Sequence, residues 1–305
     1  MRRESVTSLV SDLRLPTPRR LARGDPGIEG TVRAYLSQVH PVFMLPPLAA
    51  SLFGGLLSGS IDPAPATLHV VAMFAAVYTA HVKDGYVDFH VRGEDDDHPL
   101  TVLGCRLGLV ASTGLFALCC VGLWLLVDWI AVAITVPAWL IAYHHAPQLD
   151  TNPVTATTGY PAGIALSILG GYYVQATAIE PVPIGFALIF LVLLSGIKVI
   201  DDAQDYAYDL SIRKRTVAVV VGPDRAYAVA YGLMTTALVV VVGLAVVRVF
   251  PPSSALAAFA FAAVAVVARR APPTLATMLL IRGSYVFLAV LVAAVWFEPL
   301  AWLAG

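Results

Sequence analysis

The sequence "IGFALIFLVLLSGIKVIDDAQDYAYDLSIRKRTVAVVVG" runs from Ile184 to Gly222 and joins an apolar run to an acidic segment. The predicted span within it, 183–200, is close to the roughly 20 apolar residues that a helix needs to cross a bilayer. Four carboxylates then follow at once: Asp201, Asp202, Asp205 and Asp209. The stretch therefore predicts a membrane helix that ends in a carboxylate-rich segment at one face of the membrane.

The rest of the chain repeats the apolar pattern. Of its 305 residues, 58% are hydrophobic and 13% are charged, whereas an average soluble domain has about 25% charged residues. We predict an all-α, polytopic membrane bundle of about nine spans. Two joins, near Asp128 and near Arg269–Pro273, are tight enough that eight spans also fit. The predicted spans are 38–59, 65–83, 104–126, 128–145, 157–178, 183–200, 217–247, 253–269 and 274–300.

The basic residues predict the orientation. Of the nineteen Lys and Arg residues, all but Arg248 fall before the first span or in connections on the same side as the N-terminus. An excess of Lys and Arg marks the cytoplasmic side, so we expect a cytoplasmic N-terminus in the cell membrane. Residues 1–34 are predicted to form a partly disordered cytoplasmic arm, and 35–305 the membrane domain. A formal net charge of −1 gives no reason to expect a nucleic-acid partner, and no protein partner is inferred.

Two acidic segments end two of the spans. Asp84 and Asp88 are spaced i, i+4 after the second span, and Asp202, Asp205 and Asp209 are spaced i, i+3, i+7 after the sixth. Each set is predicted to share one helix face, where like charges repel one another by roughly 0.2–0.5 kcal/mol a pair. Mg²⁺ offsets such repulsion, and it takes one or two carboxylates together with water and substrate phosphate oxygens. The pattern predicts a Mg²⁺–diphosphate site, whereas "EDDD" (94–97) is interpreted as a solvated loop.

Basic residues stand beside both acidic segments and are predicted to bind the diphosphate. They are Lys83, Arg92, Lys198, Arg213, Lys214 and Arg215.

The motifs resemble those of the UbiA superfamily of intramembrane prenyltransferases. "DAQDYAYD" (202–209) and "TVAVVVG" (216–222) are similar to its second motif, and "AHVKDGYVD" (80–88) to its first. The chain departs from the family at Ala80 and His81, which replace an Asn and an Asp. It departs again at Asp150 and Thr151, which stand where the family has basic residues.

The resemblance implies a divergent prenyltransferase with Mg²⁺ as cofactor. It transfers a prenyl group from an allylic prenyl diphosphate to a lipophilic acceptor. Asp84, Asp88, Asp205 and Asp209 are the implied catalytic and metal-binding residues, Asp202 is a further metal ligand, and Tyr143 is a candidate to face a carbocation through its ring.

Three alternatives stay open at the level of the sequence. The chain is also compatible with a degenerate lipid-binding protein of this fold, or with a variant that resembles a terpene cyclase. An ion-coupled transporter fits less well, because transporter sites lie near the bilayer midplane and these acids gather at one face.

Overall fold

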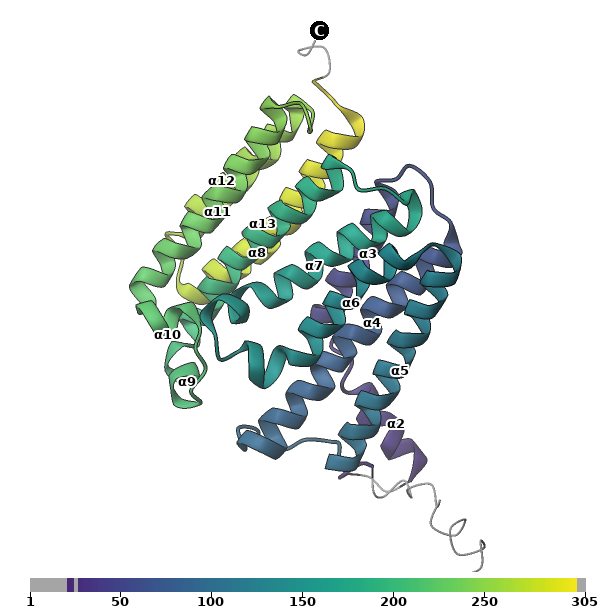
Figure 1. Cartoon of the computed structure of the whole chain (residues 1–305). Helices are drawn as coiled ribbons and strands as arrows, with labels where there is room; N and C mark the ends of the chain where they lie inside the picture. The colour runs from purple at the N-terminus through teal and green to yellow at the C-terminus, as the bar shows by residue number, and fades with distance from the viewer. Residues whose placement is uncertain (1–20, 25–26, 301–305) are drawn as a thin grey trace, which may run out of the picture.

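The computed structural model describes residues 21–24 and 27–300, and within them the chain is helical, with no strand. Figure 1 shows long helices side by side in one bundle. The elements are α2 (Ile28–Leu36), α3 (Pro41–Leu56), α4 (Pro63–Gly85), π-helix η2 (Tyr86–Arg92), α5 (Val102–Leu126), α6 (Trp129–His144), π-helix η3 (His145–Leu149), α7 (Pro153–Ala176), α8 (Pro181–Gln204), α9 (Tyr206–Ser211), α10 (Val217–Val221), α11 (Pro223–Val246), 3₁₀-helix η4 (Pro252–Ser254), α12 (Ala255–Ala268) and α13 (Pro273–Phe297).

Eight of the nine predicted spans each overlap one helix, α3–α8, α12 or α13, whereas the predicted span 217–247 covers two helices, α10 and α11, separated at Gly222. Among the described residues, six helices are long and apolar enough to cross a membrane, and the number is seven if α2 and α3, which are bent by 64° at the break between them, form one span. The all-α membrane fold is therefore confirmed. The number of nine membrane crossings and the cytoplasmic N-terminus stay predictions.

Proline and short polar side chains set where the helices begin. Proline is the first residue of α3, α4, α7, α8, α11 and α13, where its missing N–H is not needed. Asp128 caps α6 by accepting hydrogen bonds from the backbone N–H groups of Ile130 and Ala131, at 2.8 and 2.9 Å. Asn152 caps α7 in the same way through Val154 N–H at 2.9 Å. The helix starts are thus encoded locally in the sequence.

Helix α8 links the two halves of the bundle. It packs against α7 on one side and against α11 on the other. In the first half, α3 crosses α7 at very short range, because glycines at the crossing, Gly54 and Gly171, let the two backbones approach. In the second half, Phe186, Phe261 and Phe287 are fully buried among α8 and α11–α13.

Two long connections lie at the same end of the bundle, away from the C-terminus (Figure 1). One is η2 with the loop that follows it, and the other runs through α9 and α10. We call this end the acidic end, because Asp84 and Asp88 belong to the first connection and Asp205 and Asp209 to the second.

The segment before α3 packs on the acidic end. Arg23 donates its backbone N–H to Pro99 O at 2.8 Å, and its guanidinium lies 4.3 Å from the centroid of the Phe89 ring. Residues 1–20 and 25–26 of the arm predicted to be partly disordered lie outside the described residues. The boundary at residue 34 stays a prediction.

Candidate active site

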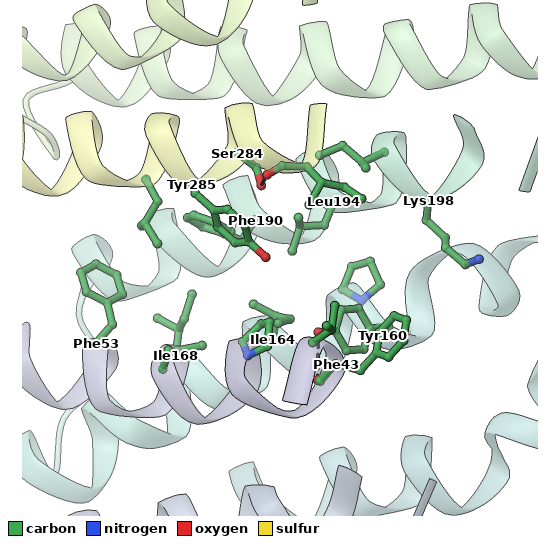
Figure 2. A pocket seen from close by; sticks show the side chains of 18 of the residues that line it. Phe43, Phe53, Tyr160, Ile164, Ile168, Phe190, Leu194, Lys198, Ser284 and Tyr285 are labelled. Carbon is green, nitrogen blue, oxygen red and sulfur yellow. Dashed lines mark hydrogen bonds between the residues drawn. The ribbon is translucent and has the colours of Figure 1, made fainter. Parts of the chain in front are cut away.

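A cavity of about 300 Å³ lies between α3, α7, α8 and α13. Its walls are apolar and aromatic, and Figure 2 shows Phe43 and Tyr160 toward one end and Phe53 and Ile168 toward the other. Lys198, on α8, lines the cavity at the end where Phe43 and Tyr160 lie, and Asp201 lines it one turn further along the helix. The cavity is therefore an apolar chamber with one charged end.

The first acidic segment continues α4 as a helix, as the sequence predicts. The chain stays helical from Pro63 to Arg92, but it widens into a π-helix after Gly85. His98 lies where the widening begins, since a Cβ atom on Gly85 would lie 2.5 Å from its ring. Asp84 and Asp88 remain close enough to interact electrostatically.

Arg92 lies among three carboxylates. Its guanidinium nitrogens are 2.6 Å from Asp150 Oδ2, 3.4 Å from Asp88 Oδ1 and 3.5 Å from Glu94 Oε1. The Glu94 side chain is 5% exposed, so this residue is not part of a solvated loop, whereas Asp95, Asp96 and Asp97 are exposed as expected. Arg92 thus joins η2 to the connection that follows α6.

The second acidic segment differs from the predicted arrangement. Helix α8 ends at Gln204, Asp205 has non-helical backbone angles, and a new helix begins at Tyr206. The expectation that Asp202, Asp205 and Asp209 share one continuous helix face is therefore wrong. The break leaves Asp202 and Asp209 buried and Asp205 exposed.

Asp202 and Asp209 lie in different surroundings. Asp202 Oδ1 is 2.5 Å from Lys198 Nζ, while its Oδ2 is buried and has no hydrogen-bond partner in the part of the chain that the structure describes. Burial raises the pKa of the Asp209 carboxyl, and the nearby Lys214, Lys198 and Thr216 oppose that shift. Both carboxylates are therefore held in sites that favour a cation.

The two acidic segments face each other across the acidic end. Lys214 interacts electrostatically with Asp88 of the first segment and with Asp209 of the second. The backbone provides a second link, because Arg215 N–H donates to Asp150 O at 3.1 Å. Asp84, Asp88, Asp202 and Asp209 thus come from segments that lie near one another.

The predicted basic residues divide into two groups. Lys198 lies at the charged end of the cavity and Lys214 between the acidic segments. Lys83 Nζ lies instead 4.2 Å from the centroid of the Tyr143 ring, and Arg213 and Arg215 are exposed. Lys198 and Lys214 are the ones best placed to meet a diphosphate.

The aromatic side chains that line the cavity are not those that the sequence suggested. Tyr143 stacks on Trp139 with ring centroids 5.1 Å apart, and it does not line the cavity. Tyr160 and Tyr285 line it instead, together with the rings of Phe43, Phe53 and Phe190. No signal in the sequence separates these residues from aromatic residues that face lipid, because both kinds lie within apolar helices.

Comparison with known proteins supports a particular fold. No protein-family model matches the sequence, and no curated protein sequence matches it. Solved structures do match. A structure of digeranylgeranylglyceryl phosphate synthase has a TM-score of 0.71 at 15% identity, over 88% of this chain and 99% of that chain. A UbiA homologue from Archaeoglobus fulgidus bound to GPP and Mg²⁺ has a TM-score of 0.62 at 15% identity, over 87% and 99%.

This chain has the UbiA fold. The apo structure of a UbiA homologue from Aeropyrum pernix K1 agrees, with a TM-score of 0.62 at 13% identity over 84% of this chain and 98% of that one. Identities this low show the fold alone. The matches nevertheless extend over almost the whole length of each homologue, so the UbiA fold accounts for the bundle from end to end.

His81, one of the positions at which the chain departs from the family motifs, lies beside a second histidine. His40 immediately precedes α3, and its ring centroid lies 4.7 Å from that of His81 on α4. The His81 ring is in turn 6.0 Å from Phe43, a cavity residue. The two histidines thus lie near a residue that lines the cavity, Phe43.

The carboxylates fit Mg²⁺ in pairs. Within the described ranges, no group of three or more His, Cys, Asp or Glu side chains is arranged to hold a metal ion. Mg²⁺ uses only one or two carboxylates and completes its shell with water and phosphate oxygens. The Asp84–Asp88 pair and the unpartnered oxygen of Asp202 therefore suit a Mg²⁺ ion that arrives with a diphosphate.

Proposed function

We propose that this protein is a prenyltransferase of the UbiA superfamily. It transfers a prenyl group from an allylic prenyl diphosphate to a lipophilic acceptor within the membrane, and it depends on Mg²⁺. The observation that carries the proposal is the apolar cavity that ends at Lys198 and Asp201, beside the two acidic segments. The bound GPP and Mg²⁺ of the Archaeoglobus fulgidus homologue support the same class of substrate.

The residues divide the work between the two ends of the site. The cavity holds the prenyl chain, whose apolar surface stabilises binding by about 25 cal/mol for each Å² removed from water. Asp84, Asp88, Asp202, Asp205 and Asp209 hold the metal. Lys198 and Lys214 stabilise the diphosphate, with Lys83, Arg92, Arg213 and Arg215 around them.

The reaction breaks the bond between the allylic carbon and the diphosphate oxygen, and the electron pair leaves with the diphosphate. Mg²⁺, when bound, supplies positive charge that stabilises this leaving group. Lys198 and Lys214 add to that stabilisation. Aromatic faces at the charged end of the cavity, above all Tyr160, stabilise the allylic cation. The acceptor then forms a bond to that carbon and loses a proton.

The site is proposed to lie at the cytoplasmic face of the cell membrane. The distribution of Lys and Arg supports this orientation, since both acidic segments share their side with most of the basic residues. Residues 1–34 are proposed as a cytoplasmic arm before the membrane domain, although its last part, from Ile28, includes helix α2.

A test combines membranes that contain the full chain with isotope-labelled prenyl diphosphates of several lengths. Mass spectrometry then identifies any labelled lipid product. We expect a product that forms only with Mg²⁺, and we expect its loss in Asp88→Asn and in Asp209→Asn. Asp96→Asn serves as the matched control, because Asp96 is an exposed acid next to the site.

A second measurement separates an enzyme from a lipid-binding protein of the same fold. Purified wild-type protein is titrated with geranyl thiolodiphosphate, an unreactive analogue, in the presence of Mg²⁺. Binding without any labelled product in membranes would argue for a binding protein. Full activity in both Asp88→Asn and Asp209→Asn would overturn the metal assignment.

A further inference from the structure

Asp150, in the connection between α6 and α7, contacts both of the long connections that form the acidic end. Its carboxylate lies 2.6 Å from the Arg92 guanidinium of η2, and its backbone carbonyl accepts a hydrogen bond of 3.1 Å from Arg215 N–H after α9. Asp150 itself follows η3. Asp150 therefore contacts both acidic segments or the residues next to them: η2, which carries Asp88, and the chain after α9, which carries Asp209.

The Asp150 carboxylate is buried and is held by Arg92 through Oδ2 alone, since Oδ1 has no hydrogen-bond partner among the described residues. Its side chain is 9% exposed, and the chain on either side is held by local hydrogen bonds. Thr155 Oγ1 donates to Leu149 O at 2.6 Å, Thr151 Oγ1 donates to Gln148 O at 2.9 Å, and Asn152 caps α7. A carboxylate on such a rigid turn can hold a partner side chain in one place.

The partner is a guanidinium that contacts a predicted metal ligand. Arg92 Nη2 is held by Asp150, which leaves Nη1 3.4 Å from Asp88 Oδ1. Arginine presents its N–H groups in a rigid fork, so the orientation of the fork at Asp150 also sets where it meets Asp88. The backbone link to Arg215 acts on the other motif, because Lys214, the preceding residue, donates its N–H to Asp209 O at 3.0 Å.

We infer that Asp150 is a positioning residue that orients Arg92 against Asp88 and ties the two acidic motifs into one binding unit for a metal–diphosphate. An acid at this position would repel a diphosphate that it touched. In this chain the acid instead fixes an arginine, and the arginine faces the site. The inference rests on the proposed function, and it concerns how the site is held together.

The test uses purified full-length protein and a readout that needs no turnover. Binding of Mn²⁺ with inorganic pyrophosphate is followed by the electron paramagnetic resonance signal of free Mn²⁺. Partners that orient metal ligands typically change metal affinity 10–100-fold. We therefore expect Asp150→Asn to weaken Mn²⁺–pyrophosphate binding by about tenfold or more, and Asp150→Glu, which keeps the charge, to weaken it less.

A double-mutant cycle shows whether Asp150 acts through Arg92. If it does, the double variant with Asp150→Asn and Arg92→Gln binds Mn²⁺–pyrophosphate no more weakly than the weaker-binding of the two single variants. Asp128→Asn is the matched control, because it removes a helix-capping carboxylate between α5 and α6, away from the acidic motifs. It is expected to lower the unfolding temperature and to leave Mn²⁺–pyrophosphate binding unchanged.

The outcomes separate this inference from the proposed function. Wild-type protein that does not bind Mn²⁺–pyrophosphate would overturn both. If Asp150→Asn binds Mn²⁺–pyrophosphate as tightly as the wild type, the positioning role alone is overturned. The same holds if the fold-losses in affinity of the two single variants multiply in the double variant. If Asp150→Asn does not fold, Arg92→Gln removes the same ion pair from its other side, and wild-type affinity in that variant would equally overturn the role.

Discussion

The Lys198 ammonium lies 2.5 Å from the carboxylate of Asp202, one helical turn further along α8, and 3.2 Å from that of Asp201. The Asp202 side chain is 5% exposed and that of Lys198 is 38% exposed. Asp202 is thus a buried carboxylate paired with Lys198, which lines the charged end of the cavity. Lys198 serves both the fold, by compensating Asp202, and the proposed reaction, by facing the diphosphate.

The first prediction separates these two roles. Lys198→Met leaves the Asp202 charge buried and uncompensated. Removal of one partner of a fully buried pair destabilises a protein by about 3–5 kcal/mol, and the exposure of Lys198 reduces that to about 2 kcal/mol. Adding Asp202→Asn removes the charge and should restore most of the stability without restoring transfer. Thermal unfolding in detergent and the labelled-lipid assay measure the two effects, and wild-type stability in Lys198→Met would contradict the assignment.

The second prediction concerns the end of the cavity away from Lys198. Phe190 and Lys198 line the cavity on α8, and eight residues of helix rise by about 12 Å, the length of a short prenyl chain. Phe53 lies at the end away from Lys198, with its ring edge-on to Phe186 at a centroid distance of 4.9 Å. Phe53→Ala should extend the cavity toward Phe186. We expect Phe53→Ala to raise the preference for geranylgeranyl over geranyl thiolodiphosphate, measured as the ratio of their dissociation constants, by about tenfold.

Phe287→Ala is the control for that prediction. Phe287 is fully buried in the packing of α8, α12 and α13 and does not line the cavity. Its removal should destabilise the protein by about 3–5 kcal/mol and leave the chain-length preference unchanged. Equal preferences in wild type and Phe53→Ala would show that another residue limits the chain.

The third prediction is a pH dependence. Burial raises the pKa of Asp209, and Lys214 lowers it. Because a metal binds the carboxylate and not the acid, Mn²⁺–pyrophosphate binding should fall as the pH drops through this raised pKa. Lys214→Met removes a charge that favours the carboxylate, so the midpoint should move to higher pH. Arg225→Met, at an exposed site on α11, is the control, and a midpoint that moves to lower pH in Lys214→Met would contradict the assignment.

Some features of this molecule follow from local sequence and others do not. The apolar blocks predict the helices because each block must satisfy its own backbone within the membrane, and prolines and capping residues mark their starts. The break at Asp205 was not predictable from the i, i+3, i+7 spacing, which assumes a continuous helix. The role of Asp150 was also hidden, because its partner Arg92 is 58 residues away in the chain.

The residues that line the cavity could not be predicted from the sequence either. Phe43, Tyr160 and Tyr285 lie on three helices that meet only in the folded bundle. Along each helix they look like any aromatic residue in an apolar run. The resemblance to UbiA proteins instead implied Tyr143, and in the fold the Lys83 ammonium lies 4.2 Å from the centroid of the Tyr143 ring.

The last prediction tests the close crossing of α3 and α7, which places the cavity walls. A methyl group on Gly171 would overlap the Ser51 carbonyl of α3, and one on Gly54 would overlap the Ile168 carbonyl of α7. Backbone atoms cannot turn aside, so Gly171→Ala should force the helices apart and destabilise the protein by about 1–3 kcal/mol or more. Gly163→Ala lies on the same helix with nothing within 4 Å of the new Cβ, and alanine there should stabilise the helix by about 0.5–1 kcal/mol. Thermal unfolding of both variants in detergent compares the two effects directly. Equal unfolding temperatures of Gly171→Ala and Gly163→Ala would mean that α3 and α7 are further apart than in the structure. The cavity wall formed by Ile164 and Ile168 would then not depend on this contact.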